Sequence, residues 1–156
     1  MTVTDEPRPA GILRGTDLIA FARGRVLATV IWDRRALVVT VLAFAPVTID
    51  PPRAAFQLAG GRRSHEVALR AGTVLFSLLA EADSGLASRF GGVGRASGWD
   101  EVLGLDLNHR PDGPPAIARA RASMHGVVLP GVEDEMNDFL VADLAPADLS
   151  PSAPPT

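Results

Sequence analysis

Short apolar stretches alternate with polar, glycine-rich or proline-rich turns along most of this 156-residue chain. Residues 25–32 (RVLATVIW) are apolar and rich in β-branched side chains, which predicts a strand. Residues 33–35 turn the chain into a second apolar stretch at 36–42, so the two stretches predict a hairpin. The same patterns predict further strands at 53–58, 74–79, 116–129 and 137–144, and short helices at 16–22, 64–71 and 83–90.

This order of elements predicts a mainly β protein. Many short strands without regular strand–helix alternation favour a β-barrel with short helices over a doubly wound sheet. One domain is expected at 16–144. It is preceded by a flexible segment at 1–15 and followed by a tail at 145–156 that is rich in Pro and Ala and is expected to be disordered.

The stretch 37–52 (LVVTVLAFAPVTIDPP) predicts a strand, a tight loop around Phe44, a second short strand and a stop at Asp50-Pro51-Pro52. Proline fixes φ, lacks an N–H group and disfavours a helical conformation in the residue before it.

The two helices that flank this region carry cap signals. Thr16 or Asp17 is expected to cap the first helix, and Ser64 the second, which ends at Gly72.

Composition excludes several kinds of chemistry. All 15 basic residues are arginine, and the chain has neither lysine nor cysteine. Lysine Schiff bases, thiol nucleophiles, disulfides and cysteine-bound zinc are therefore ruled out. No spacing of histidines and carboxylates indicates a metal site, and the net charge of −3 gives no electrostatic support for a nucleic-acid partner.

Targeting signals are not evident in this sequence. Residues 1–10 (MTVTDEPRPA) are polar and acidic, and the longest apolar runs are too short to span a bilayer. These features predict a cytoplasmic protein without a membrane partner.

Six motifs occur in a characteristic order between residues 17 and 144. A Phe-Ala-x-Gly turn precedes the first strand, a Thr-x-x-x-Phe segment ends in Asp-Pro-Pro, and an Arg-x-His-Glu-like helix start is followed by a glycine, a strand and a Leu-Ala-x-x-Phe segment. They are found at 21–24 (FARG), 38–52 (VVTVLAFAPVTIDPP), 63–66 (RSHE), 72 (G), 76–79 (FSLL) and 86–90 (LASRF). This series resembles the flavin reductase-like family, whose fold is the FMN-binding split barrel.

The resemblance implies a flavin site, with FMN or FAD as cofactor and NAD(P)H as co-substrate. It also implies a homodimer with the flavin near the subunit interface. Carried over position by position, the cofactor-binding residues would be Thr40, Val41, Leu42, Ala43, Phe44, Arg63, Ser64 and Ser77.

Two of these positions, and Val38 beside them, depart from the family pattern. Val38 stands where the family has glycine, and Leu42 and Ala43 replace small, hydroxylated residues. We expect Leu42 to narrow a cleft for a flat ring and Ala43 to remove a hydrogen-bond donor, which would weaken flavin binding. Arg63 and Ser64, next to the start of a helix, favour an anion such as phosphate. Alternatively, Ser64 only caps the helix and the arginines are solvated.

Three polar residues are candidates for catalysis. His65 matches a family position, although it could simply pack near the start of the helix. His125 lies on a predicted strand and faces either a pocket or solvent. Asn137 stands where many family members carry a histidine close to the nicotinamide.

Three functions are compatible with these observations. The first is NAD(P)H-dependent reduction of FMN or FAD, which could supply reduced flavin to a monooxygenase. The second is a cofactor-free enzyme that uses the apolar cleft to shape a hydrophobic small-molecule substrate, as in a cyclisation or isomerisation of natural-product assembly. The third is a non-catalytic flavin-binding or partner-binding subunit.

Overall fold

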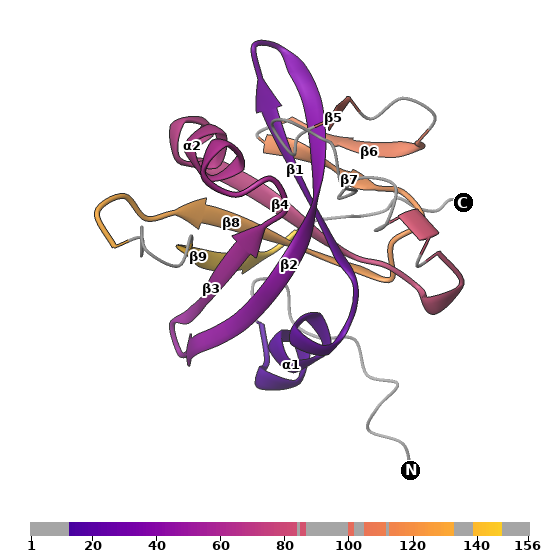
Figure 1. The fold of residues 1–156 in the computed structure, drawn as a ribbon. Coiled ribbons are helices and arrows are strands. Elements are labelled where there is room, and N and C mark those ends of the chain that lie inside the picture. The colour runs from indigo at the N-terminus through magenta and orange to yellow at the C-terminus, as the bar shows by residue number, and fades with distance from the viewer. Residues whose placement is uncertain are drawn as a thin grey trace.

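A barrel of antiparallel strands forms the centre of the protein (Figure 1). The computed structural model describes residues 13–83, 85–86, 100–101, 105–111, 113–132 and 139–147. Its elements are α1 (Gly15–Arg23), β1 (Val26–Trp32), β2 (Arg35–Ile49), β3 (Pro52–Leu58), α2 (Arg62–Ala71), β4 (Thr73–Leu78), the 3-10 helix η2 (Glu81–Asp83), β5 (Asp100–Glu101), β6 (Leu107–Arg110), β7 (Gly113–Ile117), β8 (Ala122–Val128) and β9 (Leu140–Pro146).

The barrel closes through a pairing between its two end strands. The strand order is β1-β4-β8-β9-β3-β2, and β1 also pairs with β2. Closure leaves these six strands without a free edge between them, because every strand has two neighbours. The predicted mainly β fold, a β-barrel with short helices, is confirmed.

The β1–β2 hairpin turns through two residues. Trp32 pairs with Arg35, and the intervening Asp33 and Arg34 have φ angles of 51° and 64°. Two consecutive residues with positive φ give the turn a twist that matches the right-handed twist of the flanking strands. The predicted hairpin is therefore confirmed.

Strand β2 corrects the prediction of a loop around Phe44. It continues without interruption from Arg35 to Ile49 and pairs with β3 on both sides of Phe44. Two irregularities replace the loop, one between Val41 and Ala43 and one between Pro46 and Thr48. A bulge bends a strand by inserting one residue, so the chain changes direction here without leaving the ladder.

Other boundaries also differ from the predictions. The predicted strand at 116–129 is divided into β7 and β8 by a turn, in which the N–H of Ala120 donates a hydrogen bond of 3.0 Å to the carbonyl of Ile117. Strand β9 begins at Leu140 and continues through Ala145 and Pro146, two residues into the predicted tail. Most of the helix predicted at 83–90 lies outside the described residues, as do 1–12 and 148–156.

The interior of the barrel contains one apolar core that includes residues of both α-helices. Four aromatic rings run through it in series: the ring centroids lie 5.8 Å apart for Phe21 and Phe44, 5.4 Å for Phe44 and Phe76, and 5.0 Å for Phe76 and Phe56. The second and third pairs meet edge to face, with interplanar angles of 77°, and such contacts stabilise aromatic pairs beyond their buried area. Phe21 anchors α1 to this series, whereas α2 contributes Ala68 to the core.

A second, smaller apolar cluster lies outside the barrel. Leu27 and Val38 from the barrel pack there against Ile117 of the β6–β7 hairpin and against Leu79. The hydroxyl of Thr29 donates a hydrogen bond of 2.5 Å to the carbonyl of Pro115 and so fastens β7 to the wall of the barrel. Within the described ranges, no helix is long and apolar enough to cross a membrane.

Gly126 tests the packing between β8 and the core. A Cβ atom at this position would lie 2.8 Å from Cε2 of Phe76 and 3.3 Å from Cβ of Ala142. We therefore expect Gly126→Ala to lower the free energy of unfolding by about 1–3 kcal/mol in urea titrations. Gly113→Ala is the control, because its nearest contact would be an ordinary 3.6 Å. Equal stability of the two variants would contradict this packing.

Candidate functional site

The bulge in β2 exposes the middle of the motif at 40–44. Val41 pairs with Leu58 and Ala43 with Gln57, so Leu42 has no partner in the β2–β3 register. Its side chain is 61% exposed. A bulged residue leaves the regular ladder, so the bulge presents backbone at this point outside the β2–β3 pairing.

Three hydrogen bonds connect this bulge to the start of α2. The backbone N–H of Ala59 donates to the carbonyl of Thr40 at 2.9 Å, and the hydroxyl of Ser64 donates to the carbonyl of Ala59. One residue earlier, the N–H of Leu58 donates to Nε2 of His65 at 3.2 Å. The end of β3 thereby holds the two parts of the predicted site next to each other, although they are more than 20 positions apart in the sequence.

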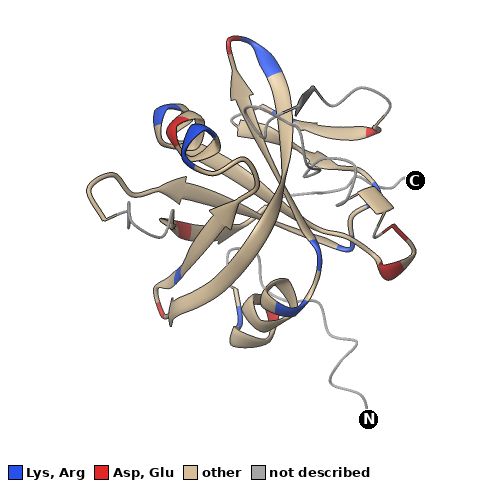
Figure 2. Ribbon diagram, in the orientation of Figure 1, with Lys and Arg blue, Asp and Glu red and all other residues tan. Residues whose placement is uncertain are grey.

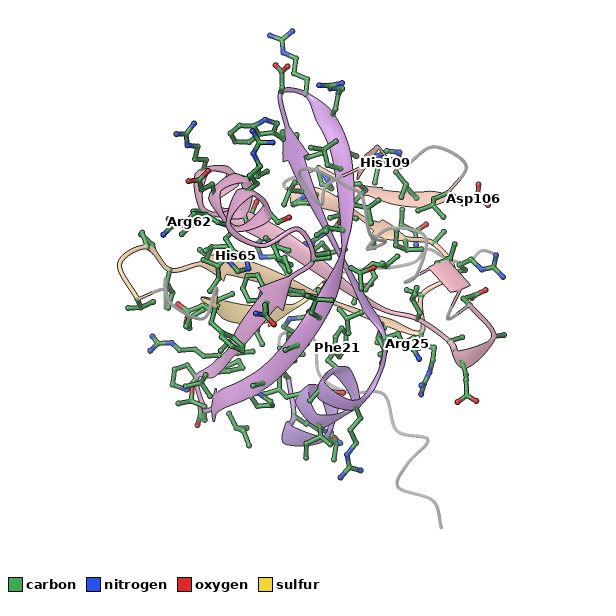
Figure 3. The ribbon with its side chains drawn as sticks, in the orientation of Figure 1. Phe21, Arg25, Arg62, His65, Asp106 and His109 are labelled. Atoms are coloured by element: carbon green, nitrogen blue, oxygen red, sulfur yellow. The ribbon has the colours of Figure 1, made fainter. Side chains whose placement is uncertain are left out.

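Ser64 and His65 have structural partners in this arrangement. Ser64 is fully buried and His65 is 6% exposed. Figure 3 shows His65 at α2, on the side of the barrel. Because Nε2 of His65 accepts a backbone hydrogen bond, the proton of the neutral ring is on Nδ1. Ser64 is not the helix cap that we predicted: α2 starts at Arg62 and its N-cap is Gly61.

The start of α2 is suited to an anion. Its N-cap makes no side-chain hydrogen bond, and its first turn contains no acidic residue. The first turn of α1, in contrast, contains Asp17, which accepts a hydrogen bond of 2.8 Å from the N–H of its N-cap, Arg14. Neither Thr16 nor Asp17 is therefore the cap of α1. Unlike α1, α2 begins with two arginines, Arg62 and Arg63, and both are exposed. The basic residues of this helix are the blue segments on α2 in Figure 2.

Arg63 also lines a shallow pocket along one face of α2. The pocket has a volume of about 190 Å³, and Trp32 of β1 forms its other wall. Arg63 thus belongs both to the lining of this pocket and to the first turn of α2.

Two of the predicted cofactor residues point into the barrel. Val41 and Phe44 belong to the apolar core, and the ring of Phe44 packs on Phe21 and Phe76. A ligand at the bulge would meet only their backbone. Thr40 and Ala43 are half-buried.

Ser77 lies beneath the β6–β7 hairpin. It is fully buried, and its Oγ accepts a hydrogen bond of 3.3 Å from the N–H of Ile117. Leu27 pairs with Thr40 on one side and with Ser77 on the other, so Ser77 is two strands away from the bulge, about 10 Å across the sheet.

The two other candidate catalytic residues are not brought to the bulge. His125 is half-buried on β8, where it pairs with Leu75 and lies close to Gly113 of β7. Asn137 lies outside the described residues. Within the described residues, no group of three or more His, Asp or Glu side chains is arranged to hold a metal ion.

An exposed apolar surface lies beyond the bulge and was not predicted from the sequence. Val47 and Ile49 at the end of β2 are 55% and 54% exposed, and Ile19 of α1 is 47% exposed. A Cβ atom on Gly15 would lie 3.2 Å from Ile49, which shows that α1 and the end of β2 are in contact. The alternating pattern at 47–49 was a usable signal, since it places two apolar side chains on one face of a strand.

Comparisons with known proteins identify a family for this sequence. The sequence profile of the family described as "Flavin reductase like domain" matches residues 18–144. No curated protein sequence matches significantly.

Solved structures with a similar fold include three whose names describe reductases or monooxygenase components. The flavin reductase of the styrene monooxygenase from Pseudomonas putida has a TM-score of 0.60 and 20% identity, covering 85% of this chain and 83% of its own. The NADH:FAD oxidoreductase from Streptomyces globisporus has a TM-score of 0.59 and 18% identity, covering 90% and 85%. A homologue of nitrilotriacetate monooxygenase component B from Mycobacterium thermoresistibile has a TM-score of 0.63 and 21% identity, covering 84% and 70%. At these identities the similarity shows a shared fold.

The connection between β3 and α2 can be tested at His65. His65→Ala leaves the buried N–H of Leu58 without its acceptor, which costs about 1–3 kcal/mol. We expect the free energy of unfolding in urea to fall by that amount. Glu66→Ala, at the exposed neighbouring position, is the control and should change it by less than about 0.5 kcal/mol. If both variants are equally stable, the hydrogen bond does not hold α2 in place.

Proposed function

Because this chain belongs to the family of flavin reductase-like domains, we propose that it binds a flavin, FMN or FAD, and reduces it with NAD(P)H. The observation that carries the proposal is the hydrogen-bonded connection of Thr40, Ala59 and Ser64. It holds exposed backbone at the β2 bulge beside the uncapped, arginine-bearing start of α2.

These two parts fit the two ends of a flavin nucleotide. The N–H groups at the start of α2, with Arg63 beside them, are suited to the phosphate. The backbone around Leu42 and Ala43 can meet the polar edge of the ring system, since backbone groups remain whatever the side chain is. Bound flavin would supply the redox chemistry by accepting a hydride from NAD(P)H. The protein's own residues would position the ring and hold its phosphate.

We also propose that the protein acts as a homodimer and that its exposed apolar surface forms the contact. Val47, Ile49 and Ile19 are large apolar side chains gathered where β2 meets α1. Grouped exposed apolar residues mark interaction sites more often than single ones do. In a dimer, the exposed Leu42 would face the partner subunit, so the cleft that it narrows would lie between the two chains.

Delivery of reduced flavin to a monooxygenase is the biological role that we propose for this activity. Two of the structural neighbours are named as reductase or component B of a monooxygenase. A reductase of this kind releases a diffusible product, so no stable complex with the monooxygenase is required.

A second function is favoured by one specific observation. The hydroxyls of Ser64 and Ser77 are both engaged with backbone groups, and Leu42 and Ala43 have no polar side-chain atoms. The side chains of the predicted set therefore offer a flavin few hydrogen bonds. This favours a cofactor-free reaction of a hydrophobic substrate at the same surface, which needs shape more than polar groups.

The first test compares two arginines on the same helix. Arg63 is in the first turn of α2 and Arg70 in the last. If the start of α2 binds the flavin phosphate, Arg63→Ala should weaken FMN binding about 10-fold, since it removes a charge-assisted hydrogen bond. Arg70→Ala should have no such effect. Binding is followed by flavin fluorescence, and NADH and NADPH oxidation is followed over a range of FMN concentrations.

The outcomes separate the two candidate functions. Flavin binding together with NAD(P)H oxidation establishes the reductase, and a higher KM for FMN in Arg63→Ala alone supports the phosphate position. A protein that neither binds FMN or FAD nor oxidises NAD(P)H contradicts the reductase and favours the cofactor-free enzyme. Flavin binding without oxidation would make the protein a flavin-binding subunit.

The dimer can be tested at Val47. We expect the wild-type chain to be a dimer in sedimentation equilibrium, and Val47→Asp to raise its dissociation constant at least about 10-fold, because a carboxylate would be buried without a partner. Ile31→Asp is the control: Ile31 is 44% exposed, but it lies at the hairpin end of β1, far along the barrel from Val47. A monomeric wild type, or an unaffected Val47→Asp dimer, contradicts the proposed contact.

A further inference from the structure

A second pocket opens on another side of the barrel, where α1 ends and β1 begins. Its volume is about 780 Å³, within the range of sites for small organic ligands. The walls come from the end of α1, the start of β1, the end of β4 with η2, and the start of β8. The lining residues are Ala20, Arg23, Gly24, Arg25, Leu79, Ala80, Glu81 and Arg121.

The charge of this pocket is strongly unbalanced. Three of its lining residues are arginines, and Glu81 is the one acid among them. Within the described parts of the chain, none of the three arginine side chains forms an ion pair or a hydrogen bond. The next acid along the chain, Asp83, is already paired with Arg119 at 2.7 Å, so it does not neutralise them.

The backbone fixes two of these arginines on either side of β4. The N–H of Leu79 donates to the carbonyl of Arg25 at 2.9 Å, and the N–H of Arg121 donates to the carbonyl of Leu78 at 2.8 Å. Leu78 pairs with Val26 on one side and with Ala122 on the other. Arg25, labelled in Figure 3, and Arg121 are thus held two strands apart, about 10 Å. Both line the same pocket.

Helix electrostatics explain only one of the three charges. Arg23 is in the last turn of α1, where a cation interacts favourably with the helix dipole. Arg25 and Arg121 lie outside the helix and are exposed, so water partly screens their mutual repulsion. Two guanidinium groups that line one pocket still make it electropositive and favour an anion there. Small residues at positions 20, 24 and 80 leave the space between them open.

We infer that this pocket binds the diphosphate group of a small molecule. A guanidinium binds phosphate oxygens through two parallel hydrogen bonds, and a diphosphate offers enough oxygens to engage Arg25 and Arg121 from opposite sides. The volume exceeds what an inorganic ion needs and leaves room for an attached nucleoside. Because Val26 pairs with Val41, the pocket also adjoins the strand that carries the β2 bulge. The inference does not depend on flavin reduction by this protein.

The test is a calorimetric titration at low ionic strength with inorganic pyrophosphate, ADP and NADPH. Arg25→Ala and Arg121→Ala should each weaken binding about 10-fold, because each removes a charge-assisted contact. Glu81→Gln should strengthen it about 2- to 5-fold by removing the opposing charge. Arg34→Asn, at the tip of the β1–β2 hairpin, makes the same change in net charge as the arginine variants and keeps a residue tolerated at positive φ, so it should have no effect.

The arms of the experiment distinguish the sources of the diphosphate. ADP or NADPH binding that is weakened about 10-fold or more in both arginine variants assigns the pocket to a nucleotide. Binding of pyrophosphate alone, weakened in the same way, assigns it to the free ion. No binding of any probe, or binding that Arg25→Ala and Arg121→Ala leave unchanged, overturns the inference. FMN titrations of the same variants separate this result from the proposed function. If the protein does not bind FMN but binds ADP through Arg25, the inference about the pocket stands and the proposed reductase function is contradicted.

Discussion

The end of β3 is the constraint on which the candidate site depends. On one side, the N–H of Ala59 donates a hydrogen bond to β2. On the other side, the N–H of Leu58 donates to His65 and the carbonyl of Ala59 accepts from Ser64, both in the first turn of α2. Buried backbone groups need partners, and here Ser64 and His65 are partners of this strand end. The hydrogen bonds that complete the barrel therefore also determine where α2 begins and which bulge of β2 it faces.

The two faces of β2 have different roles: the inner face packs in the core, and the outer face carries the proposed binding surfaces. On the inner face, Val39, Val41 and Phe44 belong to the core, and their identities follow from packing. On the outer face, Leu42 and, farther along, Val47 and Ile49 are exposed. The two bulges cause this division, because each shifts the alternation by one residue and turns an apolar side chain outward. The surface proposed for the flavin and the surface proposed for the partner subunit are thus consecutive parts of one strand.

Much of the fold was predictable, because β1, β3 and β4 carry continuous or alternating apolar residues whose period of two is a local property. The loop predicted around Phe44 was wrong, because pairing with β3 carries the strand through this stretch. Arg63 was proposed for the site from its predicted place before a helix, and the structure places it in the first turn of α2. The partners of Ser64 and Ser77 were not predicted, because a hydroxyl in a sequence does not reveal which backbone group it will meet: Ser77 binds a residue 40 positions away. The three-arginine pocket is also assembled from segments about 100 positions apart, and only the barrel topology brings them together.

The central claim is that the β2 bulge and the start of α2 form one flavin-binding surface. Its most direct test is an amide chemical-shift titration of the isotope-labelled protein with FMN. The account predicts that the largest changes occur together at Leu42 and Ala43 and at Arg62, Arg63 and Ser64, with a single dissociation constant. Changes confined to one of the two groups, or changes centred on Arg25 and Arg121 instead, would contradict it.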